Sequence, residues 1–127
     1  MTGYIVKVVE SSKELTKKEQ VMFKDLSDAI NLSEFIDEHG GSVMIDVKSY
    51  VELAIHNEKA KDGQNTDYTN YVVVDKNGTR YYTGSESFWS SFMNIWNEMN
   101  DSNEDWSLKV YKKQSKGKKD FITCSVM

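Results

Sequence analysis

Cysteine is almost absent from this sequence, since Cys124 is the only one in 127 residues. An internal disulfide is therefore impossible, which agrees with a reducing compartment, and we expect the protein in the cytoplasm. Long hydrophobic runs are missing as well. The apolar run at residues 4–9 is broken by Lys7, is far too short to span a bilayer and does not resemble a signal peptide. We expect no association with a membrane.

Groups that usually carry catalysis or bind metals are scarce. The two histidines, His39 and His56, lack partners at ligand spacing, and one cysteine cannot build a structural zinc site. The run "KGKK" lacks the glycine-rich loop and the following Ser or Thr of a phosphate-binding P-loop. Acidic pairs such as Asp25 and Asp28 are typical of the solvated face of a helix. We expect no enzyme, no metal and no cofactor.

The composition is that of one soluble globular domain. A chain of 127 residues can bury one real core, and 39% hydrophobic with 28% charged residues is unlike a disordered or membrane protein. The net charge of −4 is uneven: residues 106–127 hold six lysines and one acid, which is +5, and leave −9 on the remainder. The acidic body argues against a protein that binds nucleic acid simply through an overall positive charge. The basic terminus is either a local anion-binding face or a solvated lysine hairpin.

The first half of the chain predicts a strand, a helical region and a long strand. The long strand gives the clearest signal, because apolar residues alternate with mostly polar ones and only Ser49 interrupts them, as in a strand with one buried face. In the helical region, Asn31 and Ser33 leave open whether there is one helix or two. The expected elements are a strand at 4–10, a polar connector at 11–18, the helical region at 23–36 and the long strand at 41–56.

The second half predicts a hairpin, an aromatic helix and a second hairpin. Asn77-Gly78 tolerates the backbone angles of a tight turn, and either Thr83 or Ser85 can cap the helix that follows. In that helix, Phe88, Phe92, Ile95 and Met99 form an apolar stripe. The expected elements are a polar loop at 57–67, strands at 68–75 and 79–84, the helix at 85–99, and strands at 106–113 and 119–126 around the turn "QSKGK".

The element order from residue 41 onward predicts a five-stranded barrel. Strand, strand, strand, helix, strand, strand is the order of the oligonucleotide/oligosaccharide-binding (OB) fold, a Greek-key barrel. We therefore expect an α+β, mostly β, OB-like domain at residues 21–127, preceded at 1–20 by an N-terminal strand and polar connector. The aromatic helix would close one end of the barrel, with Trp89 and Trp96 in the core. A small open sheet with one covering helix would give the same order.

Three long runs carry a family resemblance: "MFKDLSDAINLSEFIDEHGGSVMIDVKSY", "YVVVDKNGTRYYTGSESFWSSFMNIW" and "WSLKVYKKQSKGKKDFITCSV". With the acid, glycine and tyrosine of "DKNGTRY", Ser85 before the helix and the basic terminal hairpin, they resemble the small single-stranded-DNA-binding proteins of phages of Gram-positive bacteria, those of protein-primed phages in particular. The resemblance covers residues 22–127 and is one of spacing. It implies an OB fold and cooperative, sequence-tolerant coating of single strands during phage replication in the host cytoplasm. Expected partners are single-stranded DNA, further copies of the chain on DNA, and a phage or host replication protein.

The residue pattern offers groups for such binding, because single strands are held by aromatic faces that stack bases and by cations that follow phosphates. On the last hairpin's first strand, Trp106, Leu108 and Val110 share the inner parity and leave a tyrosine between two lysines outward. The outward parity of the long strand offers a lysine and a tyrosine. The middle hairpin offers an arginine with either Tyr81 or Tyr82. The expected nucleic-acid-binding residues are Lys48, Tyr50, Arg80, Tyr82, Lys109, Tyr111, Lys113 and Lys116.

Two other functions stay open at this point. An acidic phage protein of this size could be an inhibitor of the anti-CRISPR or DNA-mimic type, whose carboxylates occupy the DNA channel of a host nuclease or defence protein. The −9 body favours that reading and the +5 terminus opposes it. The barrel could also serve as the scaffold of a protein-interaction module, since a fold alone does not decide function.

Overall fold

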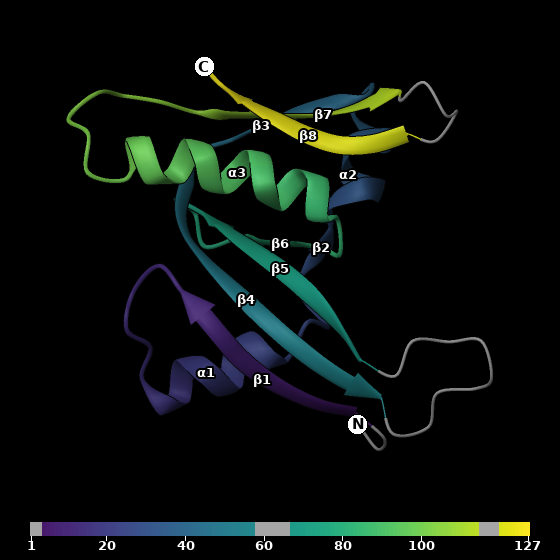
Figure 1. Ribbon diagram of the computed structural model, residues 1–127, viewed down its shortest axis with the longest axis vertical. Helices are drawn as coiled ribbons and strands as arrows, with labels where there is room; N and C mark the ends of the chain where they lie inside the picture. Colours follow the sequence, from purple (N-terminus) through teal and green to yellow (C-terminus); the bar gives the residue numbers. More distant parts are fainter. Residues whose placement is uncertain (1–3, 58–66, 115–119) are drawn as a thin grey trace.

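The computed structural model describes residues 4–57, 67–114 and 120–127, which form eight strands and three helices. The α+β, mostly β class predicted from the sequence is thereby confirmed. One sheet has the order β1-β4-β5-β6-β2, the other has the order β3-β7-β8, and helix α3 lies between them (Figure 1). The elements are β1 (Tyr4–Ser11), α1 (Lys17–Lys24), β2 (Ile30–Asn31), α2 (Leu32–Glu38), β3 (Ser42–Ile45), β4 (Val47–Asn57), β5 (Asp67–Asp75), β6 (Arg80–Thr83), α3 (Glu86–Met99), β7 (Leu108–Gln114) and β8 (Asp120–Val126).

The single long strand expected at residues 41–56 is two strands that belong to different sheets. β3 pairs with β7, whereas β4 pairs with β1 and β5, and Asp46 lies at the break between them. The pairing of β4 with β5 also shifts register between Val47 and Ser49, which marks a β-bulge. Bulges bend a strand and redirect its side chains, so this segment can turn from one sheet into the other.

The bulge also changes which face of β4 each residue occupies. Val47 and Tyr50 pack into the main core around α3, whereas Val51 and Leu53 pack into a second core on the opposite face of the five-stranded sheet. The odd-numbered apolar residues therefore belong to two cores, those before Ser49 to the main core and Val51 and Leu53 to the second. The prediction that Tyr50 faces solvent is wrong, because its side chain is 5% exposed.

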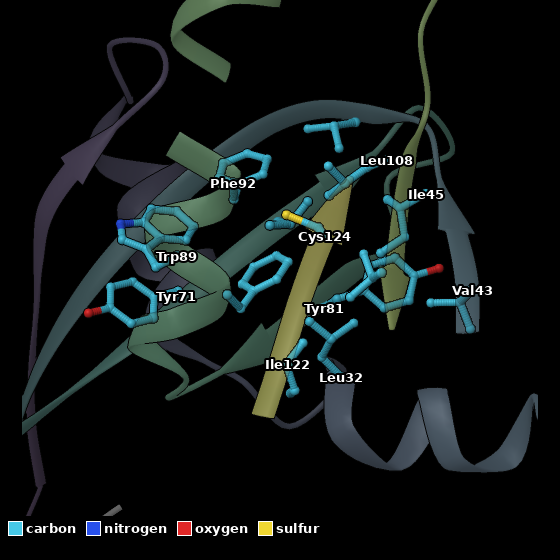
Figure 2. Close-up of a cluster of buried hydrophobic side chains, with 14 of the residues drawn as sticks. Leu32, Val43, Ile45, Tyr71, Tyr81, Trp89, Phe92, Leu108, Ile122 and Cys124 are labelled. Carbon is cyan, nitrogen blue, oxygen red and sulfur yellow. The ribbon is translucent and has the colours of Figure 1, made fainter. Parts of the chain in front are cut away.

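The main core is built around the aromatic side chains of α3. Ser85 caps this helix by accepting a hydrogen bond from the backbone N–H of Phe88, so Ser85 and not Thr83 is the N-cap. The ring of Trp89 stacks on that of Tyr71 with centroids 4.5 Å apart (Figure 2). Phe88 and Phe92 are fully buried, and Trp96 packs against the edge of the core. The predicted core role is confirmed for Phe88, Trp89 and Phe92, whereas Ile95 and Trp96 are only partly buried against the core and Met99 belongs to neither core.

The N-terminal segment covers the other face of the five-stranded sheet. Leu15, Phe23 and Leu26 pack on Val51 and Val72 and close the second core. The helix in this segment, α1, begins after a capping box made by Thr16 and Glu19 and has ended by Asp25.

The helical region expected at 23–36 is therefore wrong in its first half. Residues 25–29 are not helical, Ile30 and Asn31 pair with β6, and α2 starts only at Leu32. The side chain of Asn31 accepts a hydrogen bond from the N–H of Glu34, which fixes that start.

Within the described residues the two sheets are not joined into a barrel, since β6 and β8 do not pair. Helix α3 lies along β8 instead: Ser87 Oγ donates to the carbonyl of Ile122 at 3.0 Å, and Ser91 Oγ lies 3.1 Å from Thr123 Oγ1. These contacts take up part of the edge at which a closing strand would pair. No helix among the described residues has the length and apolar content needed to cross a bilayer.

Candidate nucleic-acid interface

Strand β7 sorts its side chains between the core and the outer face of the three-stranded sheet. Leu108 and Val110 are fully buried in the main core. The alternate residues Lys109, Tyr111 and Lys113 therefore lie on the opposite, outward face, with Lys113 exposed and the other two partly exposed. The outward parity predicted for these three residues is confirmed.

The ring of Tyr111 is held in place by its neighbours on the outer face. Its hydroxyl lies 3.0 Å from Ser125 Oγ on β8, and the ammonium nitrogen of Lys109 lies 5.6 Å from the ring centroid. That second distance is within the range of a cation–π contact. The first contact holds the hydroxyl end of the ring toward β8, and the second places a cation over one face of the ring.

The outer face of the three-stranded sheet carries cations and no acids at its paired positions. Residues paired directly across antiparallel strands share a face, so the register defines the whole set. Lysine provides the only charged side chains among them. The eight positions are Ser42 and Met44 on β3, Lys109, Tyr111 and Lys113 on β7, and Phe121, Thr123 and Ser125 on β8. We call this set the outer face.

Lys112 shows what happens to a lysine of the opposite parity on the same strand. Its ammonium group lies 2.9 Å from both carboxylate oxygens of Asp37 in α2. The pair joins β7 to α2, and the side chain of Lys112 is only 22% exposed. Lys112 is therefore committed to a contact within the protein, in contrast to Lys113 beside it.

The other predicted binding residues do not join the outer face. Tyr50 is buried, and its ring makes edge-to-face contacts with Trp89 and Trp96, with centroids 5.3 and 5.4 Å apart. Lys48 is exposed but lies at the bulge in β4, in the other sheet. Lys116 lies outside the described residues.

Arg80 and Tyr82 are used in holding the N-terminal segment. One guanidinium nitrogen of Arg80 donates to the carbonyls of Met22 and Asp25 at 2.8 and 3.0 Å, which anchors the C-terminal end of α1. Tyr82 is partly buried against the second core. Cations near the last carbonyls of a helix stabilise it, which gives Arg80 a structural role. Tyr82 has a structural role through its packing on the second core. Sequence spacing revealed neither role.

Sequence reasoning missed five members of the outer face: Ser42, Met44, Phe121, Thr123 and Ser125. Met44 was placed on the polar parity of a long strand without a role, although it is 54% exposed beside Lys109. Phe121 and Ser125 were expected only as parts of a terminal strand. The parity of β8 was a usable signal for both, because Ile122 and Cys124 are buried between them. The placement of β3 beside β7 had no local signal at all.

The titratable groups near the core are kept neutral. Burial raises the pKa of the Cys124 thiol to about 12, so this cysteine is no nucleophile near neutral pH. Burial, followed by the nearby carboxylates Glu10 and Glu52, raises the pKa of Tyr50 above its ordinary value. Among the described residues, no three His, Cys, Asp or Glu side chains are grouped so that they could hold a metal ion.

The outer face therefore has the chemistry of a binding surface. It offers an aromatic ring and ammonium groups on one face of a sheet, and together these suit a ligand with flat rings and negative charge. Comparison of the chain with protein-family models, with curated proteins and with solved structures finds no match.

Proposed function

We propose that the protein binds single-stranded nucleic acid on the outer face, without base specificity, and that DNA is its natural ligand. The observation that carries this proposal is the set Lys109, Tyr111 and Lys113, which points outward from one strand, while none of the eight paired positions of the outer face is acidic. An aromatic ring stacks on any base, and ammonium groups attract phosphates whatever the sequence.

The spacing of these three residues along β7 suits a flexible single strand of nucleic acid better than a duplex. Residues on a strand rise about 3.3 Å each, so Lys109 and Lys113 lie on the order of 13 Å apart with Tyr111 midway. A ring at that place can receive a base only if the base is not already stacked inside a double helix. The lysines then face the backbone on either side of the stacked base.

The wider architecture supports an OB-like assignment and the phage-type function that goes with it. The order β4, β5, β6, α3, β7, β8 is that of the OB fold, and the segment from β3 through β4 contributes to both sheets. We propose that the chain coats single strands during phage replication, with other copies of itself or a replication protein as further partners.

Fluorescence anisotropy with a labelled oligo-dT and a matched duplex tests the proposal. We expect binding to the single strand, poor binding to the duplex, and a slope of about −0.7 in log affinity against log salt for each phosphate contacted. Tyr111→Ala should weaken binding by about 1–3 kcal/mol through loss of stacking. Lys109→Ala and Lys113→Ala should each reduce the salt slope, because each removes a phosphate contact.

Lys112→Ala is the matched control, since it removes the same charge from the same strand but on the inner parity. It should leave the salt slope nearly unchanged. The competing function is an acidic inhibitor that occupies the DNA channel of a host protein. No shift with oligo-dT at low salt, together with tight capture of a host nuclease, would establish the inhibitor instead.

A further inference from the structure

We propose that the outer face holds three consecutive bases on a diagonal track formed by Met44, Tyr111 and Phe121. This inference rests on the proposed function and specifies its footprint. Each of the three strands contributes one of these side chains: Met44 comes from β3, Tyr111 from β7 and Phe121 from β8. The bound nucleic acid would therefore cross the three β-strands and not run along β7.

Residues paired directly across the strands form a row, and the register places the three side chains in successive rows. Met44 pairs with Lys109, Ser42 pairs with Tyr111, and Lys113 pairs with Phe121. Moving from Met44 to Tyr111, and from Tyr111 to Phe121, advances one strand and one row each time. Such diagonal neighbours on one face lie about 7–8 Å apart, a distance that large side chains can span. The three side chains are thus diagonal neighbours on one face.

Both ends of the diagonal are open to a ligand. Met44 is 54% exposed on the outward parity of β3, whose alternate residues Val43 and Ile45 are buried. Phe121 is partly exposed and belongs to neither hydrophobic core. A thioether and a phenyl ring both make favourable contacts with aromatic faces, so each can receive a base beside the one on Tyr111.

The charged side chains select a nucleic acid as the occupant of the track. Lys109 lies in the row of Met44 and Lys113 lies in the row of Phe121, so a cation is beside each end of the diagonal. None of the eight outer-face positions is acidic. A neutral apolar peptide would leave these ammonium groups without a counter-charge, whereas a short stretch of single strand supplies phosphates next to its bases.

Alanine variants of the two end residues give the first test, with the labelled oligo-dT as the probe. Phe121→Ala should weaken binding about 5- to 150-fold, as for loss of a base-stacking aromatic. Met44→Ala should weaken it about 2- to 12-fold, in the range of sulfur–aromatic contacts. The matched control is Met22→Ala on α1, which removes a methionine of similar exposure, 57%, and should leave the affinity unchanged.

Photo-cross-linking gives the second test and reports position as well as affinity. A trinucleotide of dT carrying one 5-iododeoxyuridine at its first, second or third place should attach mainly to Met44, Tyr111 and Phe121, in that spatial order or its reverse. Attachment of all three probes to one residue, or outside the outer face, would overturn the track. Urea midpoints close to that of the parent chain would show that the variants remain folded.

The outcomes distinguish a failure of the diagonal track from a failure of the proposed single-strand binding. If Tyr111→Ala weakens binding while Phe121→Ala and Met44→Ala do not, the diagonal is wrong and the single-strand function stands. If the parent chain does not bind oligo-dT at all, the proposed function fails, and the track fails with it.

Discussion

Tyr50 is the residue for which sequence and structure give opposite expectations, so replacing it tests the structural reasoning. As an outward tyrosine it would stack a base, and Tyr50→Ala would weaken binding and leave stability intact. In the structure its side chain is 5% exposed, with ring centroids 5.3, 5.8 and 5.4 Å from those of Trp89, Phe92 and Trp96. We therefore expect Tyr50→Ala to act on folding.

The magnitude follows from what the ring contacts. Truncating a buried large aromatic to alanine costs about 3–5 kcal/mol, from lost transfer energy and the cavity left behind. Edge-to-face contacts of about 0.5–1.5 kcal/mol each favour the upper part of that range here. Such a loss is a large share of a total stability of roughly 5–15 kcal/mol. With a urea slope of about 2 kcal/mol per molar, the midpoint should fall by about 1.5–2.5 M.

Tyr50→Phe is the matched control because it keeps the ring and removes only the hydroxyl. That hydroxyl donates to Glu10 at 3.3 Å, so its loss should cost only about 0.5–1.5 kcal/mol. Urea unfolding followed by tryptophan fluorescence measures both variants. If Tyr50→Ala keeps the midpoint of the parent chain and instead loses affinity for oligo-dT, the buried placement of Tyr50 is refuted.

Two further predictions concern the N-terminal segment and the buried tyrosines. Arg80→Ala should loosen the end of α1, because it removes two hydrogen bonds to carbonyls, and should leave oligo-dT affinity nearly unchanged; faster amide exchange in residues 17–25 would show this, and a loss of affinity with unchanged exchange would contradict it. Burial is the first cause that raises the pKa values of Tyr50, Tyr71 and Tyr81 above the ordinary 10.0, so the folded state keeps these protons to higher pH than the unfolded chain. Their contribution to stability should be complete below about pH 10 and be lost as pH rises further, and urea midpoints between pH 8 and 11 that do not fall would contradict this.

Local features of the sequence were enough to predict most elements and one part of the candidate site. The helix at α3 was predictable because its aromatic residues recur at helical spacing and Ser85 can cap it. The outward row on β7 was predictable because Leu108 and Val110 alternate with it. Both inferences need only the period of an element, which a single segment of chain contains.

The sequence could not show which residues of β4 face the main core and which face the second core. A period-2 pattern fixes which residues share a face only as long as the strand has no bulge, and the bulge between Val47 and Ser49 moves Tyr50 to the side of α3. The burial of Tyr50 therefore depends on partners distant in sequence. The same is true of Arg80, whose contacts at Met22 and Asp25 lie more than fifty residues away.

The sequence by itself determined an α+β, mostly β chain with an aromatic helix in its core and a basic final hairpin, because periodicity and composition are local properties. Tertiary structure decided the surface on which these parts meet. Met44 lies beside Lys109, and Ser125 beside Tyr111, only because β3 and β8 pair with β7 in one particular register. Register between strands is set by the packing of whole faces against a core, and no short segment of the chain contains that information.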